Sequence, residues 1–271
     1  MSTPSATDYD FSRCKLCGKP AKPFAEIPGG QLYACGACDL HYLDHIDGEE
    51  AGADAPLSDK ARRYIELRSD ESALLHPSRA ELVRRTAGDP PCRLLDIGAG
   101  IGQFQLLMNE EGYSTNGIEP SALRRGYAAE TFNLQLSDQP VDAHFWQDNF
   151  AAAFDLITLW DVIEHVNFPR QLLRAAVNLL KPGGLLLLDT PNRDGLSYRL
   201  SCSAARLSGG KLSLFLGNFY SAAPFGHKQI FTPAQLDSLF TDLGLEVIHR
   251  AASYGRNPHK GDKIILCGRK K

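Results

Sequence analysis

The chain has 271 residues, 43% of them hydrophobic and 23% charged, which is typical of a globular protein with one large domain and a smaller one. Its net charge of −3 argues against a protein that binds nucleic acid non-specifically. The N-terminus shows no signal-peptide pattern, and the longest strongly apolar run, residues 185–188, is too short to span a membrane. We therefore expect a cytoplasmic protein without a membrane span.

Four of the seven cysteines lie in two Cys-x-x-Cys pairs near the N-terminus. Each pair can place two thiolates on one tight turn, and paired cysteines in the cytosol bind metal more often than they form disulfides. The spacing is that of a zinc ribbon, in which four thiolates leave Zn²⁺ no open position for chemistry. We predict a zinc ribbon over residues 1–47, stabilised by structural Zn²⁺ because so short a segment buries little core. The expected ligands are Cys14, Cys17, Cys35 and Cys38.

The segment 48–90 is predicted to join this ribbon to a larger domain. Residues 48–59 are acidic and rich in alanine and glycine, which is typical of a linker. Residues 61–67 and 72–86 have helical patterns, and the Gly-Asp-Pro-Pro run at 88–91 ends the region. We expect these helices to cover an edge of the domain formed by residues 91–271.

A strand, a glycine-rich turn and a helix open that domain. An apolar run ends in three alternating glycines, Gly98, Gly100 and Gly102, and a helical pattern follows at once. Glycines let a ligand approach the backbone closely, and a helix N-terminus offers unpaired N–H groups to an anion. The dinucleotide-binding pattern G-x-G-x-x-G is not met, because its third glycine would fall at position 103, which is glutamine.

Strands and helices then alternate, which predicts an α/β fold with a largely parallel sheet. The last two strands are joined by the short loop 254–261, so they must pair as an antiparallel hairpin. Thr232 followed by Pro233 marks the start of the last helix. Strands are expected near 93–97, 115–119, 133–136, 154–160, 184–190, 245–250 and 263–268, and helices near 102–111, 121–131, 169–180 and 233–243.

The pattern Asp-x-Gly-x-Gly-x-Gly, with the acid at position 96, resembles motif I of the class I S-adenosylmethionine (SAM) methyltransferases. The Leu-Lys-Pro-Gly-Gly turn at 180–184 and the C-terminal hairpin resemble the same family, over roughly residues 90–270. The resemblance implies a Rossmann-like seven-stranded sheet that binds SAM. The ribose hydroxyls of SAM would donate hydrogen bonds to the carboxylate that ends the second strand, as in other nucleotide-binding folds. The residues implied in cofactor binding are Asp96, Gly98, Gly100, Gly102, Glu119 and Trp160.

Candidate catalytic residues follow the fourth strand in the segment 161–165. Asp161, Glu164 and His165 would share a face if this segment is a helical turn, because they are spaced i, i+3 and i+4. The segment resembles the Glu-x-x-Glu-His turn of the ubiquinone-pathway O-methyltransferases, which implies a divalent cation such as Mg²⁺ near the acceptor. Three alternatives stay open: metal-assisted catalysis, His165 as a general base, and a structural role for the turn.

His227 is a second candidate base, and the alternative is a histidine held by a loop carbonyl. It follows an insertion, residues 192–226, that mixes leucines and aromatic residues with Arg193, Arg199, Arg206 and Lys211. In the family that it resembles, an insertion at this point forms the lid of the acceptor site. Its composition suits an anionic or partly apolar acceptor, and the alternative is a helical pair that packs on the core or on a second subunit.

Together these features predict a SAM-dependent methyltransferase that acts on an oxygen atom of a small molecule or saccharide. One alternative is an RNA methyltransferase that docks through its zinc ribbon, and the slightly acidic charge argues against it. Another is a SAM-binding partner subunit without activity. The sequence leaves the acceptor and the oligomeric state open.

Overall fold

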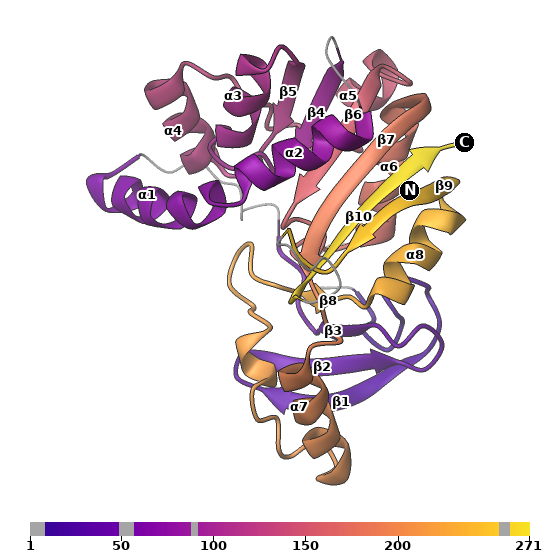
Figure 1. Ribbon diagram of the computed structural model, residues 1–271. Helices are drawn as coiled ribbons and strands as arrows, with labels where there is room; N and C mark the ends of the chain where they lie inside the picture. Colours follow the sequence, from indigo (N-terminus) through magenta and orange to yellow (C-terminus); the bar gives the residue numbers. More distant parts are fainter. Residues whose placement is uncertain (1–8, 49–56, 88–91, 255–260) are drawn as a thin grey trace.

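The computed structural model describes residues 9–48, 57–87, 92–254 and 261–271, and its strands form two sheets (Figure 1). The smaller sheet has four strands in the order β1-β2-β3-β8, and the larger has six in the order β5-β4-β6-β7-β10-β9. The strands are β1 (Ala21–Ile27), β2 (Gly30–Cys35), β3 (His41–Leu43), β4 (Arg93–Ile97), β5 (Ser114–Ile118), β6 (Phe154–Trp160), β7 (Leu180–Pro191), β8 (Gln229–Ile230), β9 (Leu245–Ala251) and β10 (Lys263–Lys270).

The larger sheet is Rossmann-like, as predicted. Strands β5, β4, β6 and β7 are parallel, whereas β10 runs antiparallel to both of its neighbours, β7 and β9. The predicted C-terminal antiparallel hairpin is therefore confirmed. Of the loop expected between its strands, residues 255–260 lie outside the described residues.

The prediction of a strand near 133–136, and with it of a seventh strand in this sheet, was wrong. Helix α4 (Ala122–Phe132) ends at Asn133 in the left-handed conformation, with φ +52°. Only Ser137 then reaches the sheet, through an isolated parallel bridge to Ile118. Leu134 instead packs over the glycine-rich turn, where a Cβ on Gly102 would lie 2.1 Å from its Cδ2. The segment is thus used to cover the turn rather than to extend the sheet.

Helices cover both faces of the larger sheet, because successive strand residues point to opposite sides. On β7, Leu185 and Leu187 pack with α2 and α3, whereas Leu186 and Leu188 pack with α6 and α8. The capping box of α8, between Thr232 and Gln235, confirms the predicted helix start. These helices are α2 (His76–Ala87), α3 (Gln103–Glu110), α6 (Pro169–Leu179) and α8 (Pro233–Asp242), and the short α5 (His144–Asn149) lies beside α6.

Helices α1 (Asp59–Ala73) and α2 precede the larger sheet and confirm the two predicted helices. The predicted boundaries between residues 1–47, 48–90 and 91–271 stay a prediction. Segments 49–56 and 88–91, which lie at those boundaries, are outside the described residues. None of the helices that the structure describes is long and apolar enough to cross a lipid bilayer.

The smaller sheet joins three strands of the N-terminal segment to β8, a strand nearly 190 residues further along the chain. Strands β1 to β3 form an antiparallel meander, and β3 pairs with β8 through His41–Ile230 and Tyr42–Gln229. The insertion 192–226 packs on the same unit (Figure 1). Its helix α7 (Leu196–Leu207) and 3₁₀ helix η2 (Leu216–Asn218) supply side chains to one cluster with β1 and β2. The shared cluster contains Ala25, Ile27, Leu32, Leu43, Tyr198, Cys202, Ala205, Leu216, Tyr220 and Ile230.

A buried ion cluster connects helix α2 to the larger sheet. Arg79 is only 1% exposed, and its guanidinium donates two hydrogen bonds of 2.9 Å to the carboxylate of Asp189 on β7. It also donates one of 2.7 Å to Asp161. Lys263 of β10 pairs with Asp161 and lies 3.6 Å from Asp189, and Tyr254 donates to Asp189 at 2.7 Å. The cluster therefore joins α2, β7, β10 and the turn after β6.

Replacing Arg79 with alanine should lower the free energy of unfolding by about 3–5 kcal/mol, because Asp189 would stay buried without its main counter-charge. The measurement is urea denaturation followed by circular dichroism. Arg84→Ala on the same helix is the matched control. Arg84 pairs with Glu81 and Glu111 at the surface, so its loss should cost about 1 kcal/mol or less. Equal effects of the two variants would contradict the role given to the buried cluster.

Candidate active site

The three glycines of the turn after β4 serve two different purposes. All have positive φ, +74° at Gly98, +61° at Gly100 and +81° at Gly102, which favours glycine. A Cβ would lie 2.5 Å from Val162 Cγ2 at Gly98 and 2.1 Å from Leu134 at Gly102, so these two positions are closed by packing. A Cβ at Gly100 would meet nothing within 4 Å. The open space at the turn therefore lies beside Gly100, where a ligand can approach the backbone.

Glu119 lies at the end of β5, facing that turn. It is buried, and its two oxygens accept one hydrogen bond each, from the N–H of Gly100 at 2.8 Å and of Ser121 at 2.9 Å. Burial raises the pKa of this carboxyl, although Arg124 opposes the shift. A carboxylate has about four acceptor positions, so two stay available for a pair of hydroxyls. This fits the expectation that Glu119 binds a ribose.

Asp96 of β4 and Trp160 at the end of β6 lie on neighbouring strands of the larger sheet. Asp96 accepts a hydrogen bond of 2.6 Å from Thr158, and burial raises the pKa of its carboxyl to about 7. Trp160 packs edge-to-face on Phe104, and the guanidinium of Arg79 lies 5.2 Å from its ring centroid. The Nε1 of Trp160 is buried and forms no hydrogen bond within the described part of the chain. One ring face of Trp160 is thus already occupied by a cation.

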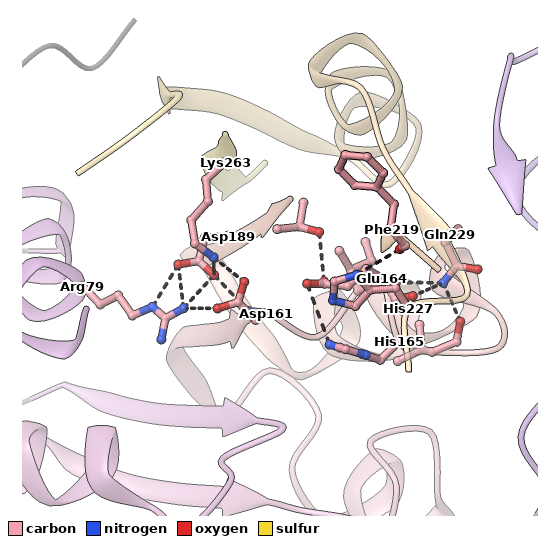
Figure 2. Close-up of polar contacts among 12 residues, drawn as sticks. Arg79, Asp161, Glu164, His165, Asp189, Phe219, His227, Gln229 and Lys263 are labelled. Atoms are coloured by element: carbon pink, nitrogen blue, oxygen red, sulfur yellow. Dashed lines mark hydrogen bonds and ion pairs between the residues drawn. The ribbon is translucent and has the colours of Figure 1, made fainter. Parts of the chain in front are cut away.

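The turn after β6 contradicts the expectation that Asp161, Glu164 and His165 share a helical face. Asp161 has φ +54°, which breaks the helical phase, and its carboxylate points to Arg79 and Lys263 (Figure 2). Burial would raise the pKa of Asp161, but these two cations outweigh it and hold the pKa below its usual value. Asp161 therefore belongs to the ion cluster and is separated from Glu164 and His165.

Glu164, His165 and His227 instead form a second group (Figure 2). Glu164 is 0% exposed, accepts a hydrogen bond of 2.9 Å from Thr190, and lies 3.9 Å from Nε2 of His165. The two imidazole ring centroids are 4.7 Å apart. Burial, with a contribution from Asp161, raises the pKa of Glu164 to about 8, and burial lowers the pKa of His165 to about 4. Both shifts favour the uncharged forms, a protonated carboxyl beside a neutral imidazole.

The hydrogen bond made by His227 fixes its tautomer. Nδ1 lies 3.2 Å from the carbonyl oxygen of Phe219, which can only accept, so Nδ1 carries the proton. Burial lowers the pKa of His227, which favours the neutral ring. Nε2 then has a free lone pair, and no hydrogen bond to it is found within the described residues. The interpretation of a histidine held by a loop carbonyl is thus correct, and it leaves the other nitrogen free to act as a base.

The residues after His227 hold the whole group in place. The Gln229 side chain donates to the carbonyls of Ile163 at 3.0 Å and Val166 at 2.6 Å, on either side of Glu164 and His165. Lys228 is fully buried, pairs with Asp47 at 3.0 Å, and donates to the carbonyl of Ala223 at 2.7 Å. Because Gln229 is also a β8 residue paired with Tyr42, the position of the histidines depends on the smaller sheet.

The donor set at the histidines does not fit Mg²⁺. One ligand atom from each of Glu164, His165 and His227 lies within 4.8 Å of the others, but two of the three atoms are imidazole nitrogens. Mg²⁺ prefers oxygen ligands in octahedral geometry. Asp161, the additional carboxylate expected in a cation site, points away.

The four predicted zinc ligands come together in the N-terminal module. Their sulfurs lie within 4.8 Å of one another, with 3.5 Å between Cys14 and Cys38 and between Cys17 and Cys35. Four sulfurs at about 2.3 Å from one Zn²⁺ would be about 3.8 Å apart. Backbone N–H groups also approach the sulfurs of Cys14 and Cys35 at 3.4 Å. The thiols are free, and the set fits a tetrahedral metal ion.

The sequence analysis missed the ion cluster around Arg79. Asp189 follows four leucines of a strand that is buried on both faces, and Arg79 stands directly before the buried Ala80 of α2. A charged residue on the apolar face of a predicted element is the available signal, since such residues are rarely buried unless paired. Its partner could not be chosen from the sequence alone.

The Glu164 carboxyl should make stability depend on pH. Its pKa is higher in the folded state than in the unfolded chain, so its contribution is fully present below about pH 4.5 and is lost as pH rises through 8. Glu164→Gln, which mimics the protonated acid, should track the wild type near pH 5 and become relatively more stable by up to about 4 kcal/mol near pH 9.

The measurement is urea denaturation at pH 5 to 9 in buffer without divalent cations. Glu26→Gln, on the exposed side of β1, is the control, and its stability difference from the wild type should stay constant. A pH-independent difference for Glu164→Gln would show that Glu164 is not held protonated.

Comparison with known proteins agrees with this geometry. The family model described as a methyltransferase domain matches residues 64–250, which exclude the cysteine module. The ubiquinone biosynthesis O-methyltransferase of Erwinia tasmaniensis is 31% identical over 175 residues, 62% of this chain and 69% of that protein. That of Pseudomonas paraeruginosa is 26% identical over 193 residues, 69% and 79% of the two chains.

A solved structure supports the fold. A SAM-dependent methyltransferase from Aquifex aeolicus superposes with a TM-score of 0.53 at 13% identity, covering 77% of this chain and 98% of that one. The glycine-rich turn, the buried acid at the end of β5 and the matched family model lead to one conclusion. The chain belongs to the methyltransferase domain family and is a SAM-dependent methyltransferase.

Proposed function

We propose that this methyltransferase transfers the methyl group of SAM to an oxygen atom of a small-molecule or saccharide acceptor. The observation that carries the proposal is His227, a neutral histidine whose tautomer leaves Nε2 as a free base beside Glu164 and His165. A hydroxyl acceptor must lose its proton, so it needs a base, whereas positioning alone can serve other acceptors. The two ubiquinone biosynthesis relatives are named as O-methyltransferases, which supports the choice of oxygen.

The cofactor would bind at the glycine-rich turn. Gly100 borders the open space, and the N-terminus of α3 has no side-chain cap, so its N–H groups can meet the carboxylate of SAM. Glu119 would accept from both ribose hydroxyls, Asp96 would lie on the ammonium side, and Trp160 would form a wall. Gly98 and Gly102 would shape the turn, because Val162 and Leu134 occupy the space beside them, and any contact of these two glycines with SAM would be through the backbone. When bound, SAM supplies an electrophilic methyl group on a sulfonium.

Residues of this chain would then accept the proton of the acceptor hydroxyl. Val162 packs against the turn at Gly98, so the segment carrying Glu164 and His165 adjoins the cofactor region. His227 Nε2 would take the hydroxyl proton as the new oxygen–methyl bond forms and the sulfur–methyl bond breaks. Glu164 and His165 would orient the acceptor, and Asp161 would act only by holding the turn against Arg79 and Lys263.

Zn²⁺ is proposed as the resident ion of the four cysteines, with a supporting role. The module carries β3, and β3 pairs with β8, which contains Gln229 and begins two residues after His227. Loss of the ion would therefore loosen the histidine group without touching the cofactor turn. The insertion 192–226 packs on the same module, so the proposed acceptor lid would be anchored there too.

The test of the function is transfer of labelled methyl from SAM to fractions of a cell extract. Label is expected in the small-molecule or glycan fraction. His227→Ala should lower the transfer rate by about 10²–10⁴-fold while leaving SAM affinity within twofold, because a base acts on the acceptor and not on the cofactor. Glu119→Ala should instead weaken SAM binding. Label in RNA, or full activity in His227→Ala, would reject the proposal.

Replacing Cys35 and Cys38 together with serine should lower the zinc content from one ion per chain to none, measured by elemental analysis. Methyl transfer should fall at least tenfold, because β3 would no longer hold β8, whereas SAM affinity should change less than threefold. Cys92→Ser, a thiol outside the cluster, is the control and should keep its zinc. A zinc-free variant with full activity would remove the supporting role assigned to the ion.

A further inference from the structure

A second recess lies in the N-terminal part of the molecule, between the start of β3 and helix α7. Its volume is about 270 Å³, and none of the proposed cofactor, base or zinc residues lines it. Figure 1 shows α7 beside β1, at the opposite end of the molecule from α3 and α4. The lining residues, called here the arginine pocket, are Asp39, His41, Arg193, Asp194, Tyr198, Arg199, Cys202, Ser203 and Arg206.

Helix α7 builds one wall of the arginine pocket. Arg199, Cys202, Ser203 and Arg206 are spaced i, i+3, i+4 and i+7, so they share one helical face. Tyr198 on the same helix is buried beside them and lies 3.0 Å from Nδ1 of His41. The helix therefore presents two guanidinium groups to the recess from positions about two turns apart on one face.

The charges of the arginine pocket leave two cations without a counter-ion. Arg193 is buried and is already paired with the carboxylate of Asp39 at 2.5 Å. Arg199 and Arg206 form no ion pair with any residue that the structure describes, although Arg206 lies 5.9 Å from the ring of Phe24. The remaining carboxylate, Asp194, is exposed to solvent. An anion entering the pocket would meet two free guanidinium groups.

His41 supplies an independent indication of a ligand-binding site. It is 2% exposed, and its Nε2 forms no hydrogen bond with the described residues; Asp39 Oδ1 is 3.5 Å away. A buried polar atom without a hydrogen bond destabilises the fold, so a ligand that accepted a hydrogen bond from it would recover part of that loss. When the Tyr198 hydroxyl donates to Nδ1, the His41 proton is on Nε2 and can be donated to an anion.

We propose that the arginine pocket binds the phosphate or diphosphate group of a small molecule. Guanidinium forks match the oxygens of phosphate, and the pocket combines the two unpaired guanidinium groups of α7 with His41 of β3. Two cations suit the charge of a phosphate, about −2 at neutral pH, better than the single charge of a carboxylate. The recess is concave and of the size of a small-molecule subsite rather than a flat patch for a macromolecule.

The pocket is within reach of the histidine group. Thr190, which donates to Glu164, precedes the pocket residue Arg193 by three residues, so their Cα atoms are at most about 11 Å apart. Resting on the proposed function, the phosphate-bearing molecule is the methyl acceptor, held by its anionic end while its hydroxyl faces His227.

The test measures binding of pyrophosphate and of uridine diphosphate by calorimetry at constant ionic strength, because exposed arginines are sensitive to salt. The wild type should bind both, and chloride should not compete. Arg199→Gln with Arg206→Gln should lower the affinity at least tenfold, and the corresponding double lysine variant should recover part of it. Arg174→Gln, on the exposed side of α6, is the control and should bind like the wild type.

SAM affinity of the same variants reports separately on the folded methyltransferase domain. No binding of either probe by the wild type, or unchanged binding by the double glutamine variant, would overturn the arginine pocket whether or not methyl transfer is found. Where labelled product is found, pyrophosphate should inhibit its formation competitively with the acceptor. If pyrophosphate binds but does not inhibit methyl transfer, the pocket does not hold the acceptor. That outcome would contradict only the link between the pocket and the acceptor.

Discussion

The pairing of β3 with β8 is the constraint on which the rest of the site depends. It has only two residue pairs, His41–Ile230 and Tyr42–Gln229, yet it joins a module from the first fifth of the chain to the loop that carries His227. The side-chain amide of Gln229 extends this constraint to the turn after β6, because it donates to carbonyls on both sides of Glu164 and His165. A strand of two residues has little stability of its own. Its position must come from the cysteine cluster on one side and the larger sheet on the other.

The buried ion cluster complements this constraint by separating two carboxylates that are three residues apart. Arg79 and Lys263 lower the pKa of Asp161, whereas burial and the charge of Asp161 raise the pKa of Glu164 and outweigh the opposing effect of Lys263. Environments that shift neighbouring acids in opposite directions give them different roles. Asp161 fixes the backbone of the turn, and the protonated Glu164 can donate a hydrogen bond beside the two histidines.

Local patterns predicted the parts of the fold that depend on local physics. The glycine-rich turn, the C-terminal hairpin, the start of α8 and the grouping of four cysteines all follow from residue type and spacing. The strand expected at 133–136 failed because Leu134 packs on Gly102, a contact between distant segments. The prediction that Asp161 and Glu164 share a face failed for the same reason, since Asp161 pairs with Arg79 of a distant helix. The partnership of β3 with β8 had no local signal at all.

The basicity of His227 bears on which hydroxyl it can deprotonate. Its pKa lies below the ordinary value of about 6.5, whereas a phenol resembling tyrosine has a pKa of about 10 and an alcohol resembles water, near 15.7. Full transfer of the proton to His227 is thus unfavourable for a phenol and much more so for an alcohol. A sugar hydroxyl could react only if its proton left as the carbon–oxygen bond formed, while an acidic hydroxyl could be ionised beforehand. The buried, neutral histidine pair therefore favours acidic acceptors over ordinary alcohols within the proposed class.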